Sequence, residues 1–439
     1  MSSRAMRFVL AALVAAASAG CGPLLVWQGR DDVGRRHVAL FEQRGRQYLR
    51  VDGVDGRRYR AVALEGLTFG PNGRRLAYPA LRADGWVVVV DGVESAAYDG
   101  IGGVVFSPDG AHVAFSAEVA GGWVVVRDAR RGARWDGLAR RTLGFGDDQR
   151  LSFGAAQGRS VRVVADGRAG PAFDAVTELV RAPRSGRLAY LAYRGTHCGV
   201  VIEGREAPAA FELERCQGLR ASPSGARVAY TAWRDACSRV FVDGDEVPDS
   251  CGVDPVSVRL SPANEGLAYT RRDGADNWVV VDGQAHGPYE TAEPVVFAAR
   301  ASPWGFVARQ AGRSVVIVDG EERASHRAAT DLALSDDGTH VAYLGTDERG
   351  SFVAHDGRRT AVDAVLGGTL VLSEDGAHWA CVVGRASTRR TYVAVDGRFA
   401  RALPFDEIAA SLAQGRDADA VTAALRDSVR AELARRARR

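Results

Sequence analysis

The sequence contains no lysine, so all 57 of its basic residues are arginine. A phosphate-binding loop of the Gly-x-x-x-x-Gly-Lys type is therefore excluded. The Gly-x-Ser-x-Gly elbow that carries the nucleophile of many serine hydrolases is absent as well. Acidic and basic residues are interspersed, and the net charge is only +3. The charge balance thus gives no reason to expect nucleic acid as a partner.

Long apolar runs are also missing, except at the N-terminus. Arg4 and Arg7 precede an apolar stretch at residues 8–17, which is too short to span a bilayer as a helix. Small residues follow this stretch. The order of charge, apolar core and small residues predicts an export signal over residues 1–21, which does not belong to the fold.

The end of this segment, Ser18-Ala19-Gly20-Cys21, resembles a bacterial lipobox, with Ser18 where that motif prefers Leu. The resemblance implies that Cys21 is lipidated and becomes the mature N-terminus. The alternative is ordinary cleavage after Ala19, which leaves Cys21 merely near the new terminus. In both cases we expect an exported protein; lipidation would make it a periplasmic or outer-membrane lipoprotein of a bacterium, held to the membrane by its N-terminal lipid.

Cysteine is scarce too, with six residues in the chain. Cys198 and Cys216 bracket one expected hairpin, and Cys237 and Cys251 bracket the next. Export favours disulfides, and opposite positions of a hairpin come within bridging distance. We therefore predict the bridges Cys198–Cys216 and Cys237–Cys251. A metal site that combines His197 with these cysteines is disfavoured, because the chain has no close Cys-x-x-Cys or His-x-x-x-His pair.

What the chain does contain is a repeat, and residues 104–128 show one complete copy. Three apolar runs are separated by the turn Ser107-Pro108-Asp109-Gly110 and by the pair Gly121-Gly122. Pro, Asp and Gly in this order suit a tight turn. The valines and aromatic residues of the runs fit a pleated, half-buried surface. The pattern predicts a β-meander.

Each copy ends its third strand on an acidic residue, which we call the anchor acid. An aromatic residue 13 positions before the anchor acid, and another seven positions after it, keep the same register in most copies. The anchor acids number the repeats from 1 to 10 and recur every 37–40 residues: Asp52, Asp91, Asp128, Asp166, Glu203, Asp243, Asp282, Asp319, Asp356 and Asp396. Several short strands per period, with no helical pattern between them, are typical of a β-propeller blade.

Ser-Pro-Asp-Gly, followed by Val-Ala-Phe or Leu-Ala-Tyr and then by Val-Val-Val-Asp-Gly, is similar to the TolB-like, WD-repeat-related β-propeller repeat of bacteria. The resemblance covers about residues 24–403. It implies an all-β fold, a β-propeller of about ten four-stranded antiparallel blades over residues 22–403. No Pro/Ser-rich linker interrupts the spacing, so we expect a single large ring in preference to two rings.

The pattern changes after Pro404. Val421, Leu425, Val429 and Leu433 are spaced for one face of a helix. We therefore expect residues 404–439 to form a helical C-terminal tail. It would pack on the propeller or fray at the terminus, and a partner-binding or membrane-surface helix is the alternative.

The sequence offers no catalytic constellation, and we expect neither a cofactor nor a metal ion. His112, His340 and His378 recur at one position of the repeat, which indicates strand-surface residues, and the anchor acids are best explained as turn formers. We expect a non-catalytic protein-interaction scaffold of the bacterial cell envelope that docks partner proteins on a propeller face. Trp304 is a candidate contact. The alternative is a small-ligand or glycan binder, or a degenerate hydrolase, that uses the mouth of the central channel.

Overall fold

The computed structural model describes residues 23–30, 36–71, 73–139, 142–207, 211–362, 364–385 and 390–403, with residues 422, 426, 429–430 and 432–434 of the tail. The export signal, Cys21 of the lipobox and residues 404–421 lie outside this part. The chain divides into two compact units, residues 1–213 with 223–225 and residues 214–222 with 226–439. Each unit is described by itself, and the choice between one ring and two stays a prediction. No helix among the described residues has the length and apolar character needed to cross a membrane.

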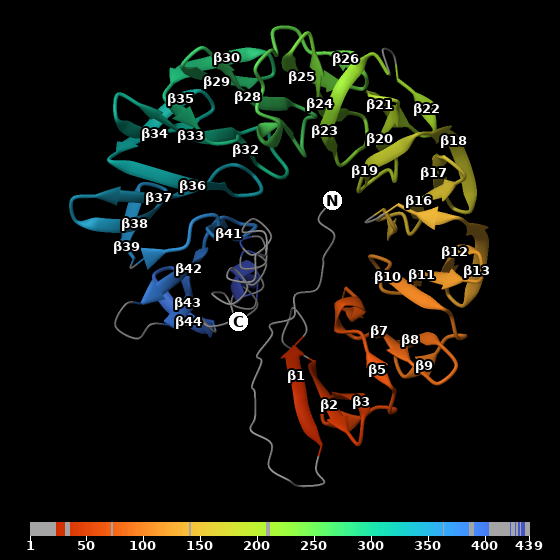
Figure 1. Ribbon diagram of the computed structural model, residues 1–439. Coiled ribbons are helices and arrows are strands. Elements are labelled where there is room, and N and C mark those ends of the chain that lie inside the picture. Colours follow the sequence, from red (N-terminus) through yellow and green to blue (C-terminus); the bar gives the residue numbers. More distant parts are fainter. Residues whose placement is uncertain are drawn as a thin grey trace. The chain divides into compact units, whose positions relative to one another are not determined.

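Repeats 1 to 5 lie in the first unit, and within each repeat the strands pair antiparallel in chain order (Figure 1). Repeats 1 and 2 contain β1 (Leu24–Arg30), β2 (His37–Gln43), β3 (Arg46–Val51), β4 (Val54–Asp55), β5 (Ala61–Val62), the 3-10 turn η1 (Leu64–Gly66), β6 (Thr68–Phe69), β7 (Leu76–Leu81), β8 (Trp86–Val90) and β9 (Val93–Glu94). Repeats 3 to 5 contain β10 (Gly100–Phe106), β11 (Val113–Val119), β12 (Gly122–Arg127), β13 (Arg130–Trp135), β14 (Gly137–Leu138), β15 (Gly144–Phe145), β16 (Leu151–Gln157), β17 (Ser160–Ala165), β18 (Arg168–Phe173), β19 (Ala175–Arg181), β20 (Leu188–Arg194), β21 (His197–Ile202) and β22 (Arg205–Glu206).

Repeats 6 to 10 make up the second unit and have the same order. Repeats 6 to 8 contain β23 (Leu213–Ala221), β24 (Val228–Arg234), β25 (Cys237–Val242), β26 (Asp245–Glu246), the 3-10 turn η2 (Pro255–Ser257), β27 (Arg259–Leu260), β28 (Leu267–Asp273), β29 (Asp276–Val281), β30 (Gln284–Tyr289), β31 (Thr291–Ala292), β32 (Val296–Phe297), β33 (Trp304–Gln310), β34 (Arg313–Val318) and β35 (Glu321–His326). Repeats 9 and 10 contain β36 (Ala328–Leu334), β37 (Val341–Asp347), β38 (Gly350–His355), β39 (Arg358–Ala361), β40 (Ala364–Val365), β41 (Val371–Leu372), β42 (Trp379–Arg385), β43 (Arg390–Val395) and β44 (Arg398–Leu403). The expected four-stranded antiparallel meander recurs, but repeats 2, 4, 8 and 10 have five strands, because two short strands take the place of the first one. The protein is therefore all-β, with sheets of four or five antiparallel strands that are consistent with a propeller.

The anchor acids form the tight turns between the third and fourth strands. All ten have positive φ values, between 45° and 53°, and the glycine after Asp52 has a φ of 86°. Positive φ at both central residues defines the turn type that matches the twist of a hairpin, and Asp and Gly tolerate it best. Their interpretation as turn formers is confirmed. The first turn of the repeat behaves as expected too, since Gly110 has a φ of 74° and its N–H donates to the Ser107 carbonyl over 2.8 Å.

The core lies between consecutive sheets within each unit. One cluster joins Val38 and Leu49 of repeat 1 to Tyr78 and Val87 of repeat 2, and similar clusters follow along the chain. The two aromatic positions of the repeat meet in these interfaces. Their rings make edge-to-face pairs 5.7–6.4 Å apart between a residue seven positions after one anchor acid and a residue 13 positions before the next: Tyr59–Tyr78, Tyr98–Phe115, Phe173–Tyr190 and Tyr289–Phe306.

The described part of the C-terminal tail is helical at residues 422, 426, 429–430 and 432–434. Val429 and Leu433 are buried, and they form one cluster with valines of β41, β42 and β43. The helix therefore covers one face of the last sheet in the second unit.

The aromatic contact between repeats predicts a graded loss of stability. Phe306 is fully buried and pairs edge-to-face with Tyr289. Phe306→Ala should lower the free energy of unfolding by about 3–5 kcal/mol, because it removes buried area and leaves a cavity. Urea unfolding measures this loss. Val256→Ala is the control, since Val256 is 68% exposed and should change stability by less than about 0.5 kcal/mol. Equal losses in both variants would contradict the packing described.

Candidate functional site

The anchor acid does more than form a turn. In nine of the ten repeats of the described chain, all but repeat 4, one of its carboxylate oxygens accepts the backbone N–H of a residue about 15 positions earlier, at the start of the second strand. In six repeats the other oxygen meets a basic side chain, arginine or histidine, one position before that residue, and the histidines are cations only when protonated. These cation–anchor pairs are Arg36–Asp52, Arg75–Asp91, His112–Asp128, Arg150–Asp166, His340–Asp356 and His378–Asp396.

Several of these cations also reach the next repeat. Arg75 bonds Asp91 over 2.8 Å, and its Nη1 donates to the carbonyl oxygens of Gly110 and Ala111 over 3.0 and 2.8 Å. Arg227 donates in the same way to the carbonyl of Glu265 over 2.7 Å. The repeated cation therefore links its own sheet to the turn of the following sheet, beside the apolar contact between them.

Repeats 7 and 8 depart from this pattern. The position of the cation is occupied by Gly266 in repeat 7 and by Pro303 in repeat 8. Asp282 and Asp319 still accept the N–H groups of Leu267 and Trp304, over 2.8 and 3.0 Å. Within the described residues, however, neither carboxylate has a basic side chain as an ion-pair partner. Two neighbouring repeats thus present an uncompensated negative charge at the same edge of their sheets.

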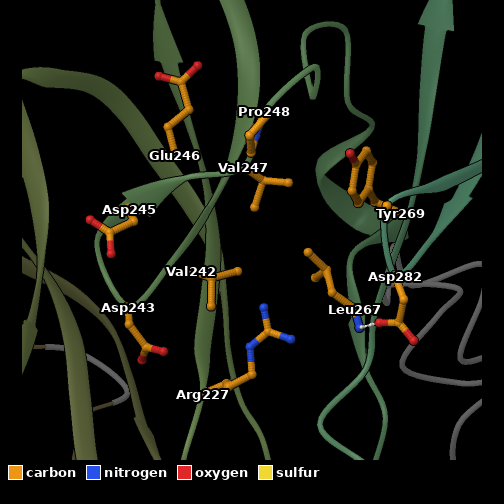
Figure 2. A pocket seen from close by; sticks show the side chains of 11 residues that line it. Arg227, Val242, Asp243, Asp245, Glu246, Val247, Pro248, Leu267, Tyr269 and Asp282 are labelled. Carbon is orange, nitrogen blue, oxygen red and sulfur yellow. Dashed lines mark hydrogen bonds between the residues drawn. The ribbon is translucent and has the colours of Figure 1, made fainter.

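An open groove of about 560 Å³ lies where repeats 6 and 7 meet (Figure 2). Figure 2 shows Asp243, Asp245 and Glu246 on one side of the groove and Tyr269 and Asp282 on the other. Apolar side chains line the space between these polar groups: Val242, Val247, Pro248 and Leu267. Arg227 also lines the groove, and Figure 2 shows its side chain between Asp243 and Asp282. The groove therefore combines apolar side chains with several carboxylates and one guanidinium.

The rim carboxylates are not equivalent. Glu246 is neutralised by Arg234 and Arg239, each at 2.7 Å. Asp245 is exposed and has no hydrogen-bond or ion-pair partner for its carboxylate in the part of the chain that the structure describes. Asp245 and Asp282 are therefore the two rim acids whose charge is available to a ligand. A cationic group that enters the groove would find a carboxylate on each side.

Trp304, the predicted partner contact, donates its backbone N–H to the anchor acid Asp319. It is the first residue of β33, not part of the turn before it, and it is half-buried. Its ring stacks on Phe306 at 6.0 Å and contacts His286 at 5.0 Å. Only part of the indole is available to a partner, because the rest packs on the core between repeats 7 and 8. An alanine at this position would therefore also remove packing.

Two partly buried carboxylates link the first strands of repeats 8 to 10. Glu293 accepts the N–H of Asp331 over 3.3 Å, and Asp331 accepts the N–H of Leu370 over 3.0 Å. Arg426 of the C-terminal helix lies 3.8 Å from Asp331 and donates to the carbonyl of Gly368 over 2.8 Å. Burial raises the pKa of Glu293 to about 7 and also raises the pKa of Asp331. No sequence pattern marks these acids, because they occupy irregular positions of the first strand that have no fixed residue type in the repeat.

The predicted cysteine positions are bridged. Cys237, the first residue of β25, forms a disulfide with Cys251, and their Cα atoms are 5.6 Å apart. Cys198 and Cys216 are each disulfide-bonded. Among the described cysteines only Cys381 is free, and it is buried. The surroundings differ from the expected hairpins of third and fourth strands. Cys216 lies on β23, the first strand of repeat 6, and Cys251 lies in a turn after β26.

One cluster in the described residues could hold a metal ion, and it was not predicted. It consists of His340, His355 and Asp356 in repeat 9, whose ligand atoms all lie within 4.8 Å of one another. His197, the disfavoured metal ligand beside the cysteines, is an exposed residue of β21.

Comparisons with known proteins find only distant likenesses among solved structures. No family model matches the chain, and no curated protein matches it. Among solved structures, "the eukaryotic initiation factor" is 11% identical over 78% of this chain and 88% of that chain, with a TM-score of 0.38. The β-propeller domain of the trilobed protease from Pyrococcus furiosus is 14% identical over 60% and 97%, with a TM-score of 0.29. TolB from Acinetobacter baumannii is 14% identical over 58% and 63%, with a TM-score of 0.23.

These are distant matches to β-propeller proteins. The likeness concerns the fold alone. The names of these proteins therefore say nothing about the substrates or partners of the chain, and the function has to be argued from its own groove and side chains.

The raised pKa of Glu293 predicts a pH-dependent stability. Its folded pKa of about 7 lies above the usual 4.5, so the folded state holds a proton that the unfolded chain releases between these values. Stability should therefore fall as the pH rises from about 5 to about 8. Glu293→Gln removes this loss and should be more stable than the wild type at pH 8 by about 1–3 kcal/mol, with a smaller difference at pH 5.

Thermal or urea unfolding at several pH values tests this prediction. The control is Glu348→Gln, which changes an exposed glutamate of the same unit. A pH-independent difference between Glu293→Gln and the wild type would show that the Glu293 carboxyl is ionised in the folded protein across this range.

Proposed function

We propose that this protein is a non-catalytic interaction module that binds protein segments with basic side chains. The binding surface, which we call the acidic edge, comprises the groove between repeats 6 and 7 together with Asp282, Asp319 and the exposed part of Trp304. The observation that carries the proposal is the loss of the repeated cation in repeats 7 and 8. Six of the other anchor acids pair with a cation of their own repeat, whereas Asp282 and Asp319 do not.

A partner arginine or lysine can take the place of the missing cation. A charge-assisted hydrogen bond to a carboxylate is worth about 1.5–3 kcal/mol, more than a bond between neutral groups. The apolar floor beside the carboxylates, Val247 and Leu267 among others, would receive an aliphatic or aromatic side chain of the same segment. Aromatic and apolar anchors surrounded by polar groups are the usual composition of protein-binding surfaces.

Asparagine substitutions test the acidic edge. Asp282→Asn combined with Asp319→Asn removes both charges but keeps an oxygen acceptor for the Leu267 and Trp304 N–H groups and a residue that tolerates positive φ. Proteins captured from a detergent-solubilised envelope fraction by the wild type and by the variant would be quantified by mass spectrometry. The specific partners should fall by at least about tenfold in the variant, and capture should weaken with salt.

The matched control is Asp91→Asn, which makes the same chemical change in an anchor acid that already has its cation, Arg75. It should leave capture unchanged. If the double variant captured the same proteins in the same amounts as the wild type, the acidic edge would not be the docking surface. Unfolding curves of all variants separate loss of binding from loss of structure.

We further propose that the module is exported and tethered to a membrane of the bacterial envelope through Cys21. The support is the order of the N-terminal residues, with arginines, an apolar core and a lipobox-like end. The mature protein purified from a bacterial host should carry acyl chains on an N-terminal Cys21, and intact-mass measurement detects them. An unmodified N-terminus at Gly20 would instead show ordinary cleavage and release.

A further inference from the structure

Repeat 9 contains the densest group of metal-ligating side chains in the described residues. The Nδ1 atom of His340 lies 2.6 Å from Oδ2 of Asp356, and the Nε2 atom of His355 lies 3.5 Å from the same oxygen. The two imidazole rings are 6.1 Å apart and tilted by 46°. All three groups are at least partly accessible, with 38%, 41% and 19% of the side chains of His340, Asp356 and His355 exposed.

The contact between His340 and Asp356 recurs in other repeats, whereas the contact between His355 and Asp356 does not. His340 occupies the place of the repeated cation, as His112 and His378 do in repeats 3 and 10. His355 directly precedes the anchor acid, where six other repeats have a valine: Val51, Val90, Val242, Val281, Val318 and Val395. The fold therefore does not require a polar side chain at position 355. Repeat 3 has Arg127 there, a permanent cation 3.6 Å from Asp128 that would repel a metal ion.

We propose that His340, His355 and Asp356 form a binding site for a divalent transition-metal ion of the zinc class. Two imidazole nitrogens and one carboxylate oxygen are the ligand set of many zinc sites that keep an open position. The same set disfavours calcium and magnesium, which prefer all-oxygen ligands.

The three ligand atoms already lie within 4.8 Å of one another, so the two imidazole nitrogens would have to approach each other by no more than about 1.5 Å. Tetrahedral ligands about 2.0–2.1 Å from zinc lie about 3.3 Å from one another. The 3.5 Å contact of His355 already fits, and the 2.6 Å contact of His340 would open by less than about 1 Å. Asp356 can remain in place while this happens, because its Oδ1 accepts the N–H of Val341 over 2.9 Å.

A fourth ligand is available in the next repeat. The carbonyl oxygen of Gly376 lies 2.8 Å from Nε2 of His355. Binding of a metal ion would replace the proton of Nε2, which shifts to Nδ1 of the same ring or to solvent, and the carbonyl would then face the ion. Residue 376 can lie this close to the two histidines only as a glycine. A Cβ atom at this position would lie 2.4 Å from Cδ2 of His340. Coordination by Gly376 would tie repeat 9 to repeat 10.

The surrounding charge also suits a cation. Asp337 and Asp375, in the first turns of repeats 9 and 10, both act electrostatically on His340, in addition to Asp356. Their own hydrogen bonds come from the hydroxyl groups of Ser335 and Ser373, which are neutral. With both imidazoles neutral, as metal binding requires, three carboxylates surround the site.

Zinc titration of the tag-free mature protein tests the proposal, since a polyhistidine tag would itself bind zinc. Competition with a chromophoric chelator, or calorimetry, should give about one Zn²⁺ per chain, and the bound ion should raise the unfolding temperature. His355→Val introduces the residue that most repeats have at this place and should weaken binding by at least about tenfold. His340→Arg restores the repeated cation, keeps the pair with Asp356, and should weaken binding equally.

His378→Arg is the matched control, because it alters the same pair in repeat 10 where no second imidazole is present. It should bind zinc as the wild type does. The described cysteines do not interfere, since four are disulfide-bonded and Cys381 is buried. No zinc binding by the wild type would overturn the proposal, and so would equal binding by the wild type, His355→Val and His340→Arg. If His355→Val failed to fold, His340→Arg would decide the question by itself.

Discussion

The anchor carboxylate is the interaction on which each repeat depends. One oxygen caps a backbone N–H at the start of the second strand, the turn residue itself adopts positive φ, and the other oxygen holds a cation that in several repeats bonds the turn of the next sheet. Repeat 2 shows all three features, because Asp91 accepts the N–H of Leu76, has a φ of 50° and pairs with Arg75. Arg75 in turn donates to the carbonyls of Gly110 and Ala111 in the next repeat. Hairpin geometry and contact between sheets are thereby coupled through one ionised side chain, which the aromatic pairs supplement.

Both proposed binding sites lie where repeats depart from this arrangement. In repeats 7 and 8 glycine and proline replace the cation, so two carboxylates that the fold usually neutralises remain available beside a groove. In repeat 9 the cation is an imidazole and a second imidazole stands beside it. A protein whose stability is spread over many similar repeats can lose one ion pair without unfolding, because each repeat contacts mainly its neighbours.

Two acidic side chains between repeats 8 and 10 lower the stability of the folded state when they are ionised. Glu293 and Asp331 are partly buried acids that accept backbone N–H groups from the following repeat, and burial raises the pKa of both. Arg426 offsets part of this cost at Asp331. The helix that carries Arg426 also covers valines of the last sheet with Val429 and Leu433, so one element provides both a charge and an apolar cover.

The sequence by itself determined the strand order, the turns, the bridged cysteines and the aromatic positions of the repeat, because each depends on residues close together in the chain or on a strict period. Asp-Gly at the hairpin and Ser-Pro-Asp-Gly at the first turn are local conformational preferences. Only the tertiary structure decided that Trp304 packs on Phe306, that Glu293 reaches the backbone of Asp331 in the next repeat, and that His355 lies beside His340. Those contacts join residues on different strands or sheets. The side chains meet because of the twist and packing of the sheets, which cannot be read from residue spacing.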